Sequence, residues 1–149
     1  MENIHMANVL FVDDDLYFMK YTIQKLAEKG HHHVRTAANL GDAIAKVREG
    51  VETIIVLDKN IGGHRGCIPF IELVRRERPG VQIVMHSGED SSLVPGHLGC
   101  DAFVFKGSSD REALLRVVNR WADKPRAETP KSKSFWDDAY GEDYYGDRL

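Results

Sequence analysis

The chain has 149 residues, which is enough for one ordinary domain and too few for two. Its 42% hydrophobic and 29% charged residues are typical of a soluble globular protein. The formal charge of −3 gives no broad cationic surface, so direct nucleic-acid binding through neutralised phosphates is not expected. The sequence has no apolar run of about 20 residues and no signal peptide, so we expect a cytoplasmic protein without a membrane span.

Five short runs rich in β-branched and aromatic residues are expected to be strands. Three of them are apolar nearly throughout, which is typical of parallel strands that are covered on both faces. In chain order the runs are Val9–Val12, His33–Ala37, Thr53–Leu57, Val81–Met85 and Ala102–Phe105.

Helical periods of apolar residues separate these runs. Asn39 is the expected N-cap of the second helix and Gly50 its stop. Residues 90–99 contain Pro95 and Gly96, which predict a short or irregular helix. The apolar stripes of the other helices are Leu16, Met19, Ile23 and Leu26; Leu40, Ala43, Ile44 and Val47; Ile68, Ile71 and Val74; and Leu114, Val117, Val118 and Trp121.

The alternation of strand and helix, repeated five times, predicts an α/β fold of the flavodoxin-like, doubly wound (βα)5 type. Its sheet should be parallel and five-stranded, in the order 2-1-3-4-5. We expect a domain over residues 7–123, preceded by residues 1–6 as an extension or cloning remnant. Residues 124–149 have an acidic and aromatic end and are expected to form a flexible tail, either solvated or acting as a short docking peptide.

Polar residues suited to one site follow four of the expected strands. Asp13 and Asp14 follow the first strand, Asp58 the third, Ser87 the fourth and Lys106 the fifth. Sites in doubly wound sheets form outside the carboxyl ends of the strands. Each of these residues alone is an ordinary turn, cap or surface residue, but their joint occurrence at four strand ends favours a shared site.

These residue types predict a particular chemistry. Three neighbouring carboxylates repel one another, and a hard divalent cation such as Mg²⁺ relieves the repulsion. A carboxylate can attack a phosphoryl group to form an aspartyl phosphate. The transferring group then needs cations around its oxygens, a role suited to Lys106, and a donor such as the Ser87 hydroxyl.

Over Ala7 to about Asp123, this set resembles the response-regulator receiver family of two-component signalling, in its stand-alone form. The resemblance implies that Asp58 is the phosphoacceptor, assisted by Lys106 and Ser87, and that Ser87 and Phe103 are the switch residues. It also implies Mg²⁺, with Mn²⁺ as an alternative ion. The implied ligands are Asp13, Asp14, Asp58 and the backbone carbonyl of Asn60.

Two positions depart from the family pattern. Gly62 stands four residues after Asp58, where the family usually has proline, and Gly107 stands after Lys106, where proline is again usual. Phe103 cannot form the hydrogen bond that a tyrosine would form there. These departures leave every chemical group in place but bear on the switching geometry.

The expected function is therefore phosphoryl acceptance on Asp58 from a histidine kinase or phosphotransfer protein. Signalling would follow from altered contacts with a downstream protein, and the chain would be no enzyme beyond slow self-dephosphorylation. The alternative is a pseudo-receiver that binds partners without phosphorylation. A phosphatase of the haloacid dehalogenase type is disfavoured, because Asn60 stands where that family has its general acid.

Overall fold

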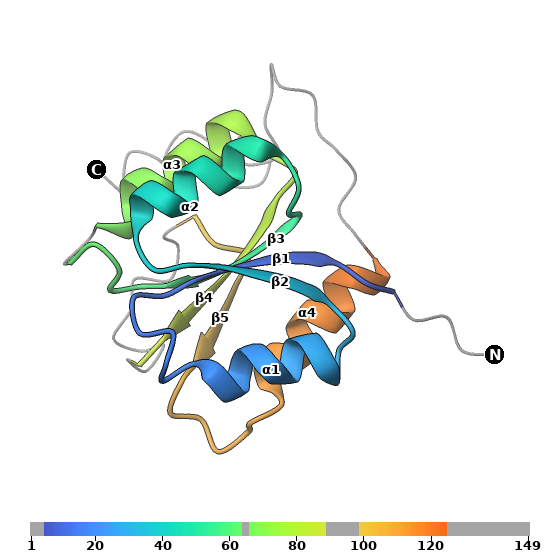
Figure 1. The fold of residues 1–149 in the computed structure, drawn as a ribbon. Coiled ribbons are helices and arrows are strands. Elements are labelled where there is room, and N and C mark those ends of the chain that lie inside the picture. Colours follow the sequence, from blue (N-terminus) through green and yellow to red (C-terminus); the bar gives the residue numbers. More distant parts are fainter. Residues whose placement is uncertain (1–4, 64–65, 89–98, 125–149) are drawn as a thin grey trace.

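The computed structural model describes residues 5–63, 66–88 and 99–124 of the chain. Five strands form one parallel sheet in the order β2-β1-β3-β4-β5 (Figure 1), which confirms the predicted flavodoxin-like fold. The strands are β1 (Asn8–Val12), β2 (His33–Ala37), β3 (Ile54–Asp58), β4 (Gln82–Ser87) and β5 (Ala102–Phe105).

Helices cover both faces of the sheet. They are α1 (Lys20–Glu28), α2 (Leu40–Glu49), α3 (Cys67–Glu77) and α4 (Ala113–Asp123). Figure 1 shows α2 and α3 on one face and α1 and α4 on the other. The irregular helix predicted within residues 90–99 lies outside the described residues, as do residues 1–4 and the tail from residue 125 onward. No helix in the described ranges is long and apolar enough to cross a membrane.

The core forms because the central strands send alternate side chains to the two faces. Leu10 and Ile55 belong to the cluster under α2 and α3. Their neighbours Phe11 and Val56 belong to the cluster under α1 and α4. Each fully buried side chain of this kind stabilises the fold by roughly 1.5–3 kcal/mol, so the two clusters hold the strand ends in fixed register.

The helix boundaries follow from local capping. The Asn39 side chain accepts a hydrogen bond of 2.8 Å from the backbone N–H of Asp42, and Gly50 ends α2 with a φ of 77°, so both predictions for this helix are confirmed. Asp15 does not cap α1, whose N-cap position is Met19. The Asp15 carboxylate accepts from the Phe18 N–H at 3.0 Å and so holds a turn that precedes α1.

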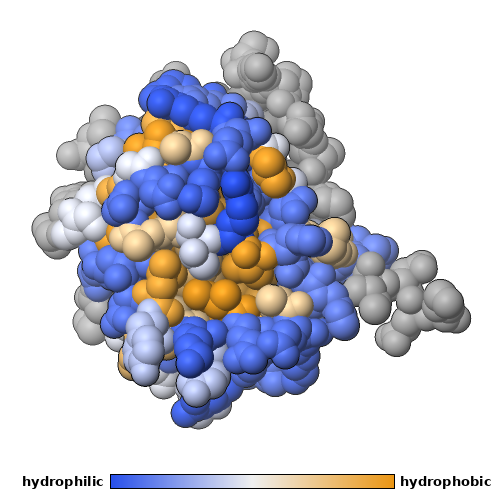
Figure 2. Space-filling view, viewed as in Figure 1, coloured by the Kyte–Doolittle hydropathy of each residue, from blue (hydrophilic) through white to orange (hydrophobic). Residues whose placement is uncertain are grey.

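Strand β2 is an edge strand, and a charged residue lies in the middle of it. Arg35 pairs with Glu52 at 2.5 Å and with Glu49 at 2.8 Å. In Figure 2 hydrophobic residues lie in the middle of this face, between the hydrophilic surfaces of the helices above and below. Charged side chains on an edge strand hinder pairing with another chain, and the Arg35 ion pairs hold such a charge in place.

The three consecutive histidines do not share one environment. His31 and His33 are exposed, as is usual for residues at the start of a strand, but His32 is only 4% exposed. Its Nδ1 accepts from the Ala7 N–H at 3.1 Å, and its Nε2 therefore donates to Asn119 Oδ1 at 2.7 Å. The histidine thus joins the start of the chain to α4.

Candidate functional site

Four strands deliver polar groups to one edge of the sheet. Asp13 follows β1, Asp58 ends β3, Ser87 ends β4 and Lys106 follows β5. The strands are parallel and their ladders are continuous, so these carboxyl ends lie next to one another. The structure thus brings the predicted residues together.

Lys106 lies between two buried carboxylates. Its Nζ is 2.8 Å from Asp13 Oδ2 and 3.4 Å from Asp58 Oδ1. The side chains of Asp13 and Asp58 are 1% and 7% exposed, whereas that of Lys106 is 17% exposed. The ammonium therefore balances one of two buried negative charges, and an uncompensated charge stays in the site.

Asp14 adds a third carboxylate from the solvent side. Asp14 is exposed, and one oxygen each from Asp13, Asp14 and Asp58 lie within 4.8 Å of one another. Oxygen donors at this spacing fit a hard divalent cation, which would also offset the excess negative charge. We refer to these three residues together with Lys106 as the acidic cluster.

The surroundings of Asp58 oppose its ionisation. Burial raises the pKa of the Asp58 carboxyl, and the charge of Asp13 raises it further. The charge of Lys106 and the Asn60 N–H, 3.3 Å from Asp58 Oδ1, both act to lower that pKa. The charged form of Asp58 thus depends on cations placed beside it.

Asn60 presents its backbone to the same region. Its carbonyl oxygen accepts a hydrogen bond of 3.0 Å from the Gly63 N–H. A carbonyl oxygen has two lone pairs, so one is left for a second partner. The Asn60 carbonyl oxygen thus has a lone pair available for the predicted role as a metal ligand.

The two predicted switch residues lie in different places. Ser87 is fully buried, and its backbone carbonyl accepts from the Lys106 N–H at 2.6 Å. Phe103 pairs with Met85, two ladder positions before the Ser87–Phe105 pair. It is half-buried and packs against the cluster under α2 and α3. Ser87 therefore adjoins Lys106 directly, whereas Phe103 lies further back along the strand.

Comparison with known proteins decides the family. The sequence model of the response regulator receiver domain matches residues 9–119, which is most of the chain. The chain belongs to the response-regulator receiver family. Receiver domains of this family are typically phosphoacceptors in two-component signalling.

Relatives of this receiver include both short and longer proteins. The transcriptional regulatory protein ResD of Bacillus subtilis is 31% identical over 122 residues, covering 78% of this chain and 49% of ResD. The chain thus spans about half the length of this curated relative. The chemotaxis response regulator CheY4 of Vibrio cholerae has a TM-score of 0.66 and 26% identity, covering 77% of this chain and 98% of its own.

A second solved structure shares the fold. Response regulator TrrA of Thermotoga maritima, crystallised in complex with Mg²⁺ and BeF, has a TM-score of 0.66 and 21% identity. It covers 77% of this receiver and 98% of the TrrA chain. At this identity the likeness concerns the fold.

The loop after Asp58 explains one departure from the family pattern. Gly62 has a φ of 77°, which proline cannot adopt because its ring fixes φ near −65°. A Cβ on Gly62 would lie 2.7 Å from Leu40 Cδ1, and a Cβ on Gly66 would overlap the backbone of Gly62. The loop therefore takes a course that requires glycine at both positions.

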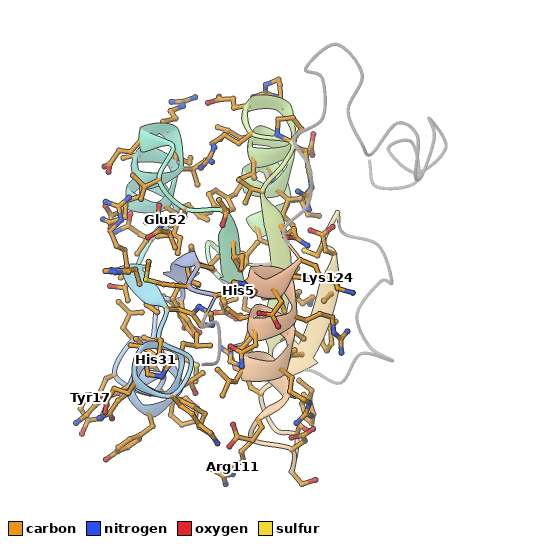
Figure 3. All side chains as sticks on the ribbon, turned by 90° about the vertical axis from the view of Figure 1, so that its right-hand side faces the viewer. His5, Tyr17, His31, Glu52, Arg111 and Lys124 are labelled. Carbon is orange, nitrogen blue, oxygen red and sulfur yellow. The ribbon has the colours of Figure 1, made fainter. Side chains whose placement is uncertain are left out.

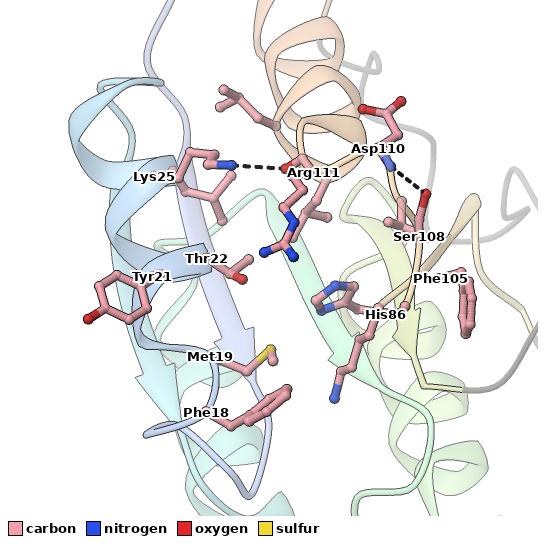
Figure 4. A pocket seen from close by; sticks show the side chains of 16 residues that line it. Phe18, Met19, Tyr21, Thr22, Lys25, His86, Phe105, Ser108, Asp110 and Arg111 are labelled. Carbon is pink, nitrogen blue, oxygen red and sulfur yellow. Dashed lines mark hydrogen bonds between the residues drawn. The ribbon is translucent and has the colours of Figure 1, made fainter.

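Beside the acidic cluster, the receiver has a pocket that the sequence did not predict. It has a volume of about 350 Å³ and lies between α1 and the β5–α4 connection (Figure 4). Lys106 and His86 both line it, so one lysine belongs to both regions. A histidine within the apolar run of β4 was the one available sequence signal.

His86 is neutral and incompletely bonded. It is 5% exposed, and its ring meets Phe11 edge to face with centroids 6.0 Å apart. Burial, and then the charge of Lys106, lower the pKa of His86 to about 4. Its buried Nδ1 has no hydrogen-bond partner among the described residues. His86 thus carries a buried polar atom beside the pocket without a partner among these residues.

Proposed function

We propose that this receiver accepts a phosphoryl group on Asp58 from the phosphohistidine of a histidine kinase or phosphotransfer protein. The observation that carries the proposal is the acidic cluster, in which Lys106 lies 3.4 Å from Asp58 and two further carboxylates adjoin it. Within the proposal, residues 7–123 form the receiver domain and residues 124–149 its tail.

In the proposed reaction an Asp58 oxygen attacks phosphorus, and the bond from phosphorus to the donor's imidazole nitrogen breaks. The electron pair of that bond stays on the nitrogen, so no general acid of this chain is required. Lys106 is placed to leave Asp13 in part and to neutralise charge on the phosphoryl oxygens. The buried Ser87 hydroxyl is the candidate donor to the same oxygens.

Asp13, Asp14, Asp58 and the Asn60 carbonyl would hold Mg²⁺, which supplies charge neutralisation for the phosphoryl oxygens when bound. The donor set supports this assignment, since all four ligands are oxygens. The complex of TrrA with Mg²⁺ and BeF is consistent with it.

The proposed output is a change in protein contacts. An aspartyl phosphate would attract Lys106 and Ser87 and repack the strand ends around them, with Phe103 following along β5. The partners are then a phosphodonor protein and a downstream protein target in the cytoplasm, without direct contact of this domain to nucleic acid or membrane.

The test is the response of the backbone amides to beryllofluoride and millimolar Mg²⁺. We expect the ¹⁵N–¹H signals of Ser87 and Lys106 to shift in the wild type and to stay unchanged in Asp58→Asn. Asp15→Asn is the matched control, because the Asp15 carboxylate holds the turn before α1 and lies outside the acidic cluster. Acetyl phosphate should label the wild type and Asp15→Asn, with a bond that hydroxylamine cleaves.

A second candidate is a pseudo-receiver that binds partners without phosphorylation. It is favoured by the position of Lys106, which is closer to Asp13 than to Asp58. Gly107, which replaces the usual proline after that lysine, adds freedom to the same loop. A wild-type spectrum that stays unchanged with beryllofluoride and Mg²⁺ would establish this candidate and exclude the first.

A further inference from the structure

The pocket between α1 and the β5–α4 connection has an apolar floor and an aromatic rim. Met19, Leu26 and Leu114 are buried at its base. Phe18 and Tyr21 also line it and are 71% and 74% exposed. A volume of about 350 Å³ is enough for an aromatic side chain with its neighbours. The pocket thus offers apolar contact area that this part of the chain leaves uncovered.

An exposed cation without an ion pair in the described part of the chain lines the same pocket. Arg111 is exposed and forms no ion pair within the described ranges, and in Figure 4 its guanidinium points toward Thr22 and His86. The buried His86 Nδ1 is unpartnered there as well. By contrast, Lys25 already donates to the Arg111 carbonyl at 3.0 Å. A guanidinium at the mouth of an apolar pocket suits a carboxylate carried next to an apolar group.

The chain itself contains a segment with this chemistry. Residues 135–147 hold five aromatic and five acidic residues and no lysine or arginine. Residues 1–134, by contrast, hold 19 basic and 18 acidic residues. The segment begins Phe135-Trp136-Asp137-Asp138, in which large aromatic rings directly precede two carboxylates. The negative charge of the chain is therefore concentrated in a segment that also carries five aromatic residues.

The segment can reach the pocket. The β5–α4 connection, which lines the pocket, leads into α4, and Lys124 follows the far end of that helix (Figure 3 labels Arg111 and Lys124). An 11-residue helix is about 16 Å long. The ten residues between Lys124 and Phe135 can span up to about 33 Å when extended. The connection is thus long enough to return along α4 to the pocket.

We propose that residues 135–138 of the tail dock in this pocket of the same molecule. An aromatic ring of Phe135 or Trp136 occupies the apolar floor, and a carboxylate of Asp137 or Asp138 binds the guanidinium of Arg111. The docked segment covers Phe18 and Tyr21. This contact requires no phosphorylation and is independent of the function proposed for Asp58.

The test uses NMR of the full-length protein without Mg²⁺ or phosphodonor. We expect nuclear Overhauser effects between the Phe135 or Trp136 ring and methyl groups of Leu114 or Met19, unchanged on tenfold dilution. Arg111→Glu should reduce the docked population about tenfold, since it removes a charge-assisted contact. Arg111→Gln is the milder second variant. Arg120→Glu is the matched control, because Arg120 is exposed in the last turn of α4.

Several outcomes would contradict the proposal. Absence of these effects in the wild type excludes docking in the pocket. Effects that weaken on dilution, or that appear between labelled and unlabelled molecules, show docking between two copies and exclude the intramolecular contact. Equal behaviour of Arg111→Glu and Arg120→Glu excludes the carboxylate contact. Displacement of the Leu114 and Met19 methyl signals in the double variant Phe135→Ala/Trp136→Ala but not in Tyr144→Ala supports the assignment to residues 135–138, and equal displacement in both variants excludes it.

Discussion

The two regions that share Lys106 differ in how their polar groups are satisfied. In the acidic cluster, Lys106 Nζ lies 2.8 Å from Asp13 and 3.4 Å from Asp58. In the adjacent pocket, His86 has an unpartnered nitrogen and Arg111 has no ion pair among the described residues. The first region is held together by its own charges, while the second is held by apolar packing and leaves polar groups unused. Substitutions in the acidic cluster should therefore change how stability depends on divalent cations, and substitutions in the pocket should change how it depends on pH.

The largest effect expected concerns pH and the pocket side. Burial lowers the pKa of His86 from 6.5 to about 4. Between pH 6.5 and pH 4, His86 is therefore protonated in the unfolded state and neutral in the folded state. The unfolding free energy should fall by about 3 kcal/mol from this group as pH drops from 6.5 to 4, with no contribution above 6.5. Urea unfolding at several pH values measures it.

The non-titrating variant His86→Gln should have a flatter pH profile than the wild type over this range. His33→Gln is the control, because His33 is exposed at the start of β2. Parallel profiles for the wild type and His86→Gln would show that folding does not lower the pKa of His86.

The next effect concerns the shared lysine. Lys106→Met leaves the buried Asp13 and Asp58 carboxylates without their cation, so the unfolding free energy without divalent ions should fall by about 2 kcal/mol. Millimolar Mg²⁺ should restore more stability to the variant than it adds to the wild type. Lys46→Met breaks a surface pair with Asp42 and should cost only a few tenths of a kcal/mol.

An equal response of Lys106→Met and Lys46→Met to Mg²⁺ would mean that the lysine and the cation do not balance the same carboxylates. In that case charge balance at Lys106 would not be what holds the acidic cluster together, and the contrast with the pocket would not apply to this residue.

The smallest effect separates backbone strain from steric overlap in the loop after Asp58. Gly62 and Gly63 have similar φ values of 77° and 85°, but only Gly62 has a neighbour, Leu40, in the path of a Cβ. Gly62→Ala should therefore be less stable than Gly63→Ala by about 1 kcal/mol. Thermal unfolding of the two variants measures the difference, and equal stabilities would show that strain alone fixes the loop.

The sequence predicted the acidic cluster because the pattern of apolar residues locates the strand ends, and the sheet topology brings these ends together. Once the apolar runs identify parallel strands, Asp13, Asp58 and Lys106 must lie at one edge. The capping residues Asn39 and Gly50 were predictable for the same local reason.

The pocket was not predictable, since it depends on how far α1 stands from the β5–α4 connection. That distance depends on the side chains of α1 and α4 and on the turn before α1, because of which the helix begins only at Lys20. The burial of His32 was not predictable for a similar reason, because its partners Ala7 and Asn119 are remote in the sequence.

The His32 contact has a consequence for the order of folding. His32 and Asn119 are 87 positions apart, so this hydrogen bond closes one of the longest loops in the domain. Contacts of such high sequence separation carry a large entropic cost and tend to form late. A nascent chain that has not yet released α4 from the ribosome therefore holds an imidazole nitrogen without its acceptor. The His32–Asn119 hydrogen bond can therefore form only after α4 has been translated and released.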